Sequence, residues 1–266
     1  MKKFLVALSA MAAFTGSAMA ADMAPRYSKA PPPVVAPVYN WTGFYIFGGV
    51  GGGLWDANTG AFNTATGTCL VCINNKQGGD GWFGTVGAGY DWQFNSRWVF
   101  GLLGDGQFGS LKGSESVTVA GVGGLVFNQK LEDTWAVGAR LGYLVAPNVL
   151  SYVNGGYTGA NWAGATIVGA ANGVAAGAHT NSFSTQGWFF GGGFENNLDI
   201  FGITAPGWFM KTEYRGAYYE SKNSVWLNDA TNTPFGVSSS FKPFVQTIST
   251  SLVYRFNWGG PVVSHY

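Results

Sequence analysis

The chain has 266 residues, of which 10% are charged and 16% aromatic, and its formal net charge is +1. A nearly neutral chain with so few charges has no electrostatic footprint for nucleic acid, so we expect no nucleic-acid partner. Glycine accounts for 42 residues, about twice its usual share of ~7%, yet it lacks the every-third-residue period of collagen.

The N-terminus has the features of a secretory signal peptide. Lys2 and Lys3 precede an apolar run over residues 4–18, and Ala18-Met19-Ala20 has the small-residue pattern of a cleavage site. The run is shorter than the ~20 residues that a membrane-spanning helix needs. We therefore predict a signal peptide over 1–20, followed by an extended Pro/Ala-rich lead-in over 21–40.

From Trp41 onward, eight segments show the two-residue alternation of β-strands. The segment 81–94 is the clearest, because Trp82, Val86, Tyr90 and Phe94 share one face with other apolar residues while small and polar residues share the opposite face. We predict strands over residues 41–54, 81–94, 98–109, 131–143, 149–158, 187–196, 208–219 and 242–256.

The last predicted strand has the pattern of a strand that faces lipid. Ile248, Leu252, Tyr254 and Phe256 lie on one face, and the residues between them are mostly small or polar. An apolar outer face and a polar inner face over about ten residues are typical of outer-membrane barrels. We therefore interpret these four residues as the signal of the strand that closes a barrel.

The connections between the predicted strands alternate in length. Those after the first, third, fifth and seventh strands each exceed twenty residues. Those after the second and fourth are tight turns at Asn95-Ser96-Arg97 and Ala146-Pro147-Asn148, whereas the connection after the sixth is longer than expected. Outer-membrane barrels place long loops outside the cell and short turns in the periplasm.

No segment after the signal peptide is long and apolar enough to span a bilayer as a helix, which leaves closed strands as the way to cross a membrane. The predicted fold class is all-β: an eight-stranded antiparallel up-and-down transmembrane β-barrel over 41–256. We expect it in the outer membrane, with the long loops extracellular, both mature termini periplasmic and a periplasmic tail over 257–266.

Stretches spread over most of the mature chain, in order, resemble a known family. They include NWTGFYIFGGVGGG, GWFGTVGAGYDWQF, AVGARLGYLVAPN, WFMKTEYRG and SLVYRF. The chain is similar to the small porin-like outer-membrane proteins of alphaproteobacteria, a group that includes immunogenic surface proteins and reported haemin binders. The resemblance implies an eight-stranded barrel. Leu103 departs from the acidic residue and Phe189 from the threonine that relatives commonly carry at these positions.

The inward faces of the predicted strands carry equal numbers of acids and bases. Because an eight-stranded interior is only wide enough for side chains, these charges must pair or stay wetted. We expect a balanced lumenal charge network that stabilises the interior, with a narrow polar path for ions as the alternative. Its members are Asp91, Asp105, Arg140, Glu195, Lys211, Glu213, Arg215 and Arg255.

Few residues favour other chemistry. Cys69 and Cys72 lie in the first long connection, and in an oxidising compartment this single pair favours a small disulfide over a zinc site; free thiols or an intermolecular bridge are the alternatives. The only histidines are His179 and His265, and no nucleophile or base motif accompanies them. We expect no enzyme activity, no cofactor and no metal.

Aromatic residues in the predicted loops, Trp162, Phe183 and Trp226, are interpreted as anchors at the membrane rim or as a binding surface. We expect a protein of mainly structural and surface-display function. A narrow passive channel, or binding of host tissue or haemin through the long loops, are the alternatives. The expected partners are outer-membrane lipid, lipopolysaccharide and the barrel-assembly machinery, and we expect a monomer.

The C-terminal tail provides a test of where the barrel ends. Gly259-Gly260-Pro261 interrupts the strand pattern after Phe256, so the tail cannot prolong the last strand. Deleting residues 259–266 should leave membrane insertion intact, whereas Tyr254→Asp combined with Phe256→Asp should abolish it, as measured by outer-membrane fractionation. If the deletion alone blocked insertion, the predicted end of the barrel would be wrong.

Overall fold

The computed structural model describes residues 39–119, 123–198, 202–203 and 205–256. The predicted signal peptide, nearly all of the lead-in and the C-terminal tail lie outside these residues. Among the described residues, no helix is long and apolar enough to cross a membrane.

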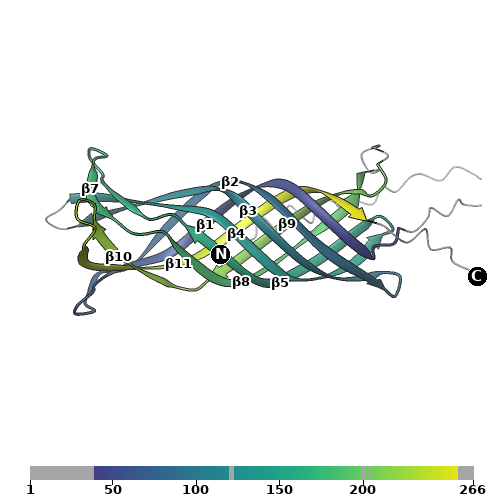
Figure 1. Ribbon diagram of the computed structural model, residues 1–266, viewed down its shortest axis with the longest axis horizontal. Coiled ribbons are helices and arrows are strands. Elements are labelled where there is room, and N and C mark those ends of the chain that lie inside the picture. The colour runs from purple at the N-terminus through teal and green to yellow at the C-terminus, as the bar shows by residue number, and fades with distance from the viewer. Residues whose placement is uncertain (1–38, 120–122, 199–201, 204, 257–266) are drawn as a thin grey trace, which may run out of the picture. The chain divides into compact units, whose positions relative to one another are not determined.

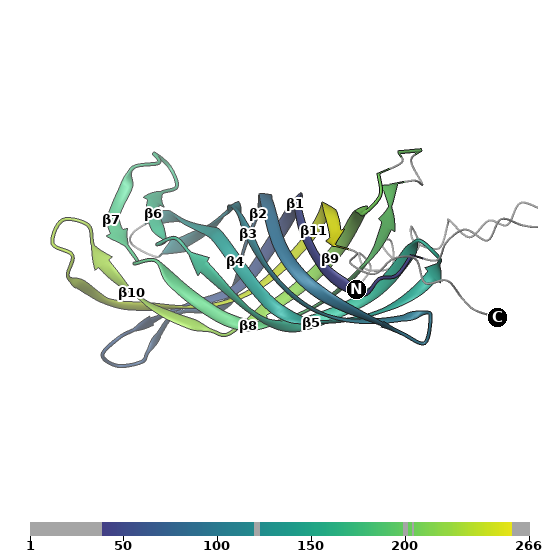
Figure 2. The same cartoon turned by 45° about the vertical axis from the view of Figure 1, so that its right-hand side comes forward.

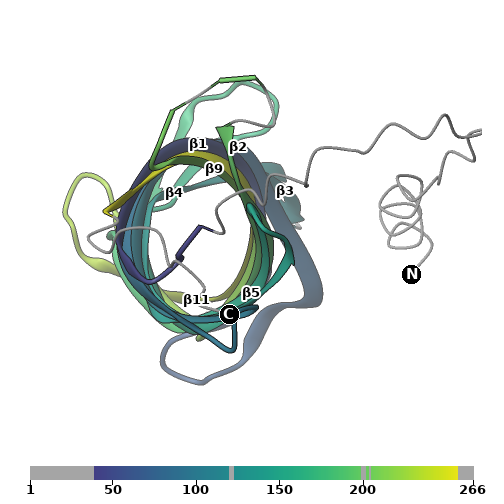
Figure 3. The ribbon, with the colours of Figure 1, turned by 90° about the vertical axis from the view of Figure 1, so that its right-hand side faces the viewer.

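Eight long strands form a closed antiparallel ring (Figures 1 and 3). The order around the ring is β1–β2–β3–β4–β5–β8–β9–β11, and β11 closes it by pairing with β1 from Phe44↔Phe256 to Asn63↔Val237. The predicted eight-stranded barrel is therefore confirmed. The ring strands are β1 (Gly43–Asn63), β2 (Cys69–Phe94), β3 (Trp98–Val119), β4 (Gly123–Ala146), β5 (Val149–Trp162), β8 (Phe183–Asn197), β9 (Trp208–Tyr219) and β11 (Pro234–Phe256).

Three short strands lie in the two connections after β5 and β9. They are β6 (Thr166–Gly169), β7 (Ala175–His179) and β10 (Lys222–Asn228). β10 pairs with β11 and β7, β7 pairs with β6, and β6 pairs with β4. Figure 2 shows all three at one end of the barrel, where they join β4 to β11 above the end of the ring.

The outer face of the ring is apolar and exposed. Trp82 is 80% exposed, and Val50, Ile248 and Leu252 each expose half or more of their surface. A band of this kind is too large for a water-soluble monomer, which rarely exposes apolar patches above a few hundred Å². The band ends where the outward residues become polar, at Asp56, Asp80 and Lys112. The predicted faces of the second and last strands agree with this band.

The strands extend well beyond their predicted ends, so the prediction of four connections longer than twenty residues was wrong. The β1–β2 connection is only residues 64–68, and β3 continues to Val119. Above the apolar band the outward residues meet water, and in places the inward ones are small or polar as well, as in the serine run 238–240 of β11. The alternation that marks a half-buried strand is absent there, although the backbone pairing continues.

The opposite end of the barrel has the predicted tight turns. Asn95 and Ser96 both have positive φ angles, 50° and 55°, between β2 and β3. Two consecutive positive φ angles match the twist of the paired strands in a short hairpin. β4 and β5 are joined across 147–148, whereas β8 and β9 are separated by residues 198–207, the long connection that the sequence indicates.

A closed ring of paired strands leaves no free edge, which makes the barrel resistant to detergent. We expect the purified protein to migrate faster on detergent gels without boiling than after boiling. The measurement is the mobility difference, with circular dichroism to verify β-structure. Equal mobility of the two samples together with a helical spectrum would contradict the fold.

Candidate functional site

The lower charge layer lies inside the barrel near the tight turns and consists of Asp91, Arg140, Glu195 and Arg255. Arg140 donates from Nε and Nη2 to the two oxygens of Asp91, at 3.0 and 2.5 Å, and from Nη1 to Glu195 at 3.2 Å. Arg255 donates to Glu195 at 2.6 Å and to Asp91 at 2.8 Å. Each arginine therefore bridges both carboxylates, and the four side chains, all at most 4% exposed, form a closed ring of ion pairs.

This layer takes one residue from every second strand of the ring, namely β2, β4, β8 and β11. The tilt and stagger of strands in a small barrel bring inward residues of alternate strands to one level. Below it, the backbone carbonyl of the fully buried Trp41 accepts a hydrogen bond from Arg255 Nη1 at 3.2 Å. Trp41 thus covers the end of the layer.

The upper charge layer consists of Asp105 on β3 and Lys211, Glu213 and Arg215 on β9. Arg215 donates to both oxygens of Asp105, at 2.8 and 2.7 Å, and to Glu213 at 2.8 Å. Lys211 Nζ lies 3.7 Å from Glu213, which also accepts a hydrogen bond from the Tyr152 hydroxyl at 2.9 Å. The structure thus brings the eight predicted residues together as two layers, each with two acids and two bases.

Aromatic rings cover the cations of both layers. Lys211 Nζ lies 3.3 Å from the ring centre of Phe47, and the guanidinium of Arg215 lies 4.5 Å from that of Phe189. Arg140 and Arg255 both stack against Tyr45, at 4.4 and 4.9 Å. Such contacts stabilise a cation by about 0.5–2 kcal/mol, more where water is excluded.

Glycines on the neighbouring strand make room for these rings. A Cβ atom at Gly89 would collide with the hydroxyl and ring of Tyr45, and one at Gly87 would collide with the ring of Phe47. The high glycine content is therefore explained in part by large inward side chains, which need a neighbouring residue that has no side chain.

An aromatic plug fills the barrel above the charge layers. Trp55, Trp162 and Phe241 pack edge to face, with ring centres 4.9–5.7 Å apart. Leu111 and Leu131 belong to the same buried cluster. A cavity between this cluster and Thr134 measures about 10 Å³, which is at the lower limit for one water.

The two departures from the family pattern also lie in this buried cluster. Phe189 is 1% exposed and Leu103 is 8% exposed. Apolar side chains at these positions extend the plug toward the upper charge layer.

The loop aromatics differ from the prediction of rim anchors. Trp162 is 1% and Trp226 6% exposed, and Phe183 stacks against Trp162 with ring centres 6.4 Å apart. All three face inward, because the segments that carry them are part of the strand-built end of the barrel rather than loops on the membrane surface.

The remaining predicted residues lie apart from the lumen. Cys69 is disulfide-bonded; the side chain of Cys72 lies outside the described ones, so their pairing stays a prediction. His179 Nδ1 lies 2.6 Å from Asp229 Oδ1 on an exposed surface. Among the described residues, no group of three or more His, Cys, Asp or Glu side chains could hold a metal ion.

Comparison with protein families gives a match between residues 6–256 and the outer membrane protein beta-barrel domain. The chain belongs to this family. It is 30% identical over 257 residues to the 31 kDa outer-membrane immunogenic proteins of Brucella melitensis and Brucella suis. The alignment covers 96% of this chain and 100% of each relative.

A solved structure with a similar fold is the outer membrane protein OprG from Pseudomonas aeruginosa. It aligns with 82% of this chain and 98% of its own, at 11% identity and a TM-score of 0.45. The family match and the Brucella relatives confirm the family that the sequence motifs indicate, so this chain is an outer-membrane β-barrel protein.

The lower charge layer can be tested by removing one arginine. Arg140→Ala leaves Asp91 and Glu195 with Arg255 as their remaining cation, and breaking a buried pair in this way costs about 3–5 kcal/mol. We expect a loss of this size in the free energy of unfolding, measured by urea titration of the barrel in lipid vesicles.

Lys130→Ala is the matched control. Lys130 pairs with Glu132 at 3.2 Å, but both side chains are more than a third exposed. Exposed pairs contribute about 0–1 kcal/mol, so this variant should differ little from the wild type. Equal losses in the two variants would show that the lumenal network does not stabilise the barrel.

Proposed function

We propose that this outer-membrane β-barrel protein has a mainly structural role in the envelope and displays its strand-built end on the cell surface. The observation that carries the proposal is the filled lumen. Two charge layers and the aromatic plug occupy successive levels of the barrel, and the eight ionisable groups of the layers are neutralised by one another. An interior of this kind suits a rigid scaffold rather than a pore.

The orientation follows from the asymmetry of the two ends. In this proposal the end with tight turns at 95–97 and 147–148 faces the periplasm, where we also expect both mature termini. The end with β6, β7 and β10 faces outward, as expected for the longer connections of an outer-membrane barrel. The Brucella relatives are named as immunogenic proteins, which supports display on the cell surface.

The same arrangement supports a non-enzymatic role. Catalytic carboxylates need a free acid or base beside a substrate, but Asp105 and Glu213 both accept hydrogen bonds from Arg215, and Glu195 accepts them from Arg140 and Arg255. These carboxylates are therefore engaged in ion pairs inside the lumen and do not provide a free acid or base.

The partners follow from the outer surface. The apolar band would contact outer-membrane lipid, and the barrel-assembly machinery would insert the chain as a monomer. Just above the band, Lys112 and Lys130 line an open groove of about 360 Å³ with Ser114 and Asn128. Its two lysines suit the phosphates of lipopolysaccharide.

A second candidate function is surface binding of host tissue or haemin through the outward end. The resemblance to a group that includes reported haemin binders favours it. His179 is a partly exposed imidazole at that end, so loss of haemin binding in His179→Ala, with Lys222→Ala as a surface control, would support this candidate.

Planar-bilayer recordings test the structural role against a passive channel. We expect the wild type to show no steady conductance, or a very small and weakly selective one, because the lumen is filled. Arg140→Ala should change the stability of the barrel more than its conductance. A steady, large channel in the wild type would contradict the proposal.

A further inference from the structure

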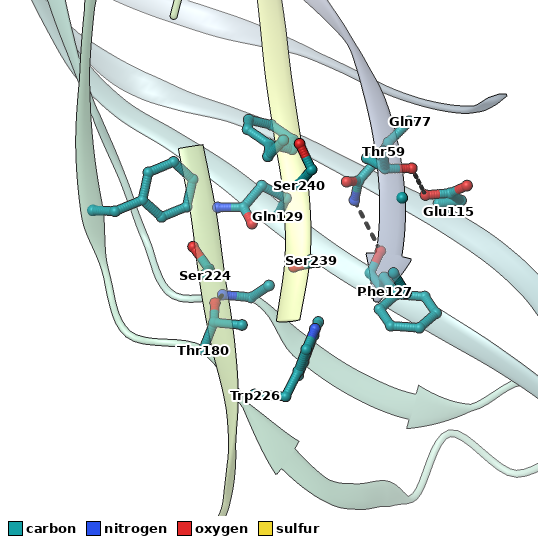
Figure 4. Close-up of a pocket in the computed structure, with 15 residues that line it drawn as sticks. Thr59, Gln77, Glu115, Phe127, Gln129, Thr180, Ser224, Trp226, Ser239 and Ser240 are labelled. Carbon is teal, nitrogen blue, oxygen red and sulfur yellow. Dashed lines mark hydrogen bonds between the residues drawn. The ribbon is translucent and has the colours of Figure 1, made fainter. Parts of the chain in front are cut away.

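The outward end of the barrel contains a cup above the aromatic plug (Figure 4). Its walls come from β1, β2, β3, β4, β8, β10 and β11, and Phe241 of the plug forms part of its lining. The short strand β10, through Ser224 and Trp226, therefore supplies a wall of the cup that the ring of eight alone does not make. The volume of the cup is about 90 Å³.

This volume sets the size of a ligand. A single water needs roughly 10–15 Å³ of such space, so the cup holds about six to nine waters. That is room for a small organic molecule, and far more than a bare metal ion requires. Binding sites for such molecules are commonly concave and mostly apolar, with a few polar groups that fix the orientation.

Two buried amides line the cup and present oxygen atoms. Gln77 is 5% and Gln129 6% exposed, and each Nε2 donates to a backbone carbonyl, that of Phe127 at 3.2 Å and that of Ala163 at 2.5 Å. A backbone carbonyl can only accept a hydrogen bond, so the amide nitrogen of each glutamine must point toward it. The other amide atom, Oε1, is then left without a role in this contact. Among the described residues, no protein group donates a hydrogen bond to either Oε1, so both oxygens can accept one from a ligand in the cup.

A carboxylate lies on the same wall. Glu115 is half-buried, and its Oε2 accepts a hydrogen bond from the Thr59 hydroxyl at 3.0 Å. The described residues that line the cup include no Lys, Arg or His side chain. A partly buried carboxylate without a cation nearby differs from the eight lumenal groups below, all of which are ion-paired.

Aromatic rings supply the rest of the lining. Phe127 packs edge to face with Trp226, with ring centres 5.5 Å apart, and Phe183 does so with Phe241 at 5.8 Å. Aromatic faces attract cations as well as apolar groups. The cup therefore combines a negative charge, acceptor oxygens and aromatic rings.

We propose that this cup binds small protonated amines with an apolar body. The ammonium group donates hydrogen bonds to Glu115 and to the Oε1 atoms of Gln77 and Gln129, and the apolar body packs against Trp226 and Phe127. The charge of the ligand compensates the carboxylate, and its N–H groups supply the donors that the two amides lack.

Calorimetric titration of the purified full-length protein in detergent tests this, with titration into protein-free micelles subtracted. The probes are benzylammonium, benzyl alcohol and benzoate, which share a ring and differ in charge. We expect saturable binding of benzylammonium, about tenfold weaker binding of benzyl alcohol, and none of benzoate.

Glu115→Gln keeps the shape of the side chain and removes its charge, and should weaken benzylammonium binding by about tenfold. Glu132→Gln is the matched control, because Glu132 is an exposed carboxylate outside the cup, paired with Lys130, and it should leave the affinity unchanged. Trp226→Leu tests the aromatic wall and should also weaken binding. Gel mobility without boiling verifies that each variant is folded.

Three results would overturn the proposal. Absence of saturable benzylammonium binding to the folded wild type would exclude the site. Equal affinity for benzylammonium and benzyl alcohol would make it a neutral apolar site. Selective binding that Glu115→Gln and Trp226→Leu both leave unchanged would place the cation elsewhere. If Glu115→Gln did not fold, the ligand comparison and Trp226→Leu would still decide.

Discussion

Closing eight strands into a ring leaves an interior only wide enough for side chains, so every inward residue must be compatible with those facing it. In this protein the constraint is met by ion pairs at two levels. Asp91 and Glu195 each accept hydrogen bonds from both Arg140 and Arg255, which come from different strands. The network therefore ties β2, β4, β8 and β11 across the lumen, in addition to the hydrogen bonds between neighbouring strands.

The packing of the lumen follows from the presence of these charges. An ion removed from water is costly unless its partners lie close and saturate its hydrogen bonds. Arg215 meets most of this condition, because its two terminal nitrogens donate to Asp105, at 2.8 and 2.7 Å, and to Glu213, and the ring of Phe189 covers the guanidinium. Among the described residues, only its Nε has no hydrogen-bond partner. Glycines such as Gly89 provide the space that the inward rings need. The narrow interior thus accounts for three features together: the paired charges, the aromatic rings that cover them and the glycines beside those rings.

The outward end of the barrel is richer in small and polar residues than the membrane-spanning part, because it lies outside the lipid. Above the apolar band both faces of the strands can contact water, so small and hydroxyl-bearing residues are tolerated on either side. The short strands β6, β7 and β10 join β4 to β11 there, and β10 forms part of the wall of a cup above the plug. Glu115 is the acid on this wall, and it contrasts with the paired acids of the lumen. A site for a ligand can therefore exist at this end without opening the barrel.

Local alternation was enough to predict the ring, the apolar outer face of the strand ending at Phe256, and the inward position of all eight lumenal charges, because the two-residue period of a strand assigns each side chain to a face. Which charges pair was not predictable, since Arg140 and Asp91 are 49 residues apart and meet through the stagger of the strands. The extended strands, the inward position of Trp226 and the acceptors Gln77 and Gln129 also depended on the tertiary structure. In those segments neither face of the strand contacts lipid, so the sequence does not alternate between apolar and polar residues, and the strands cannot be recognised from it.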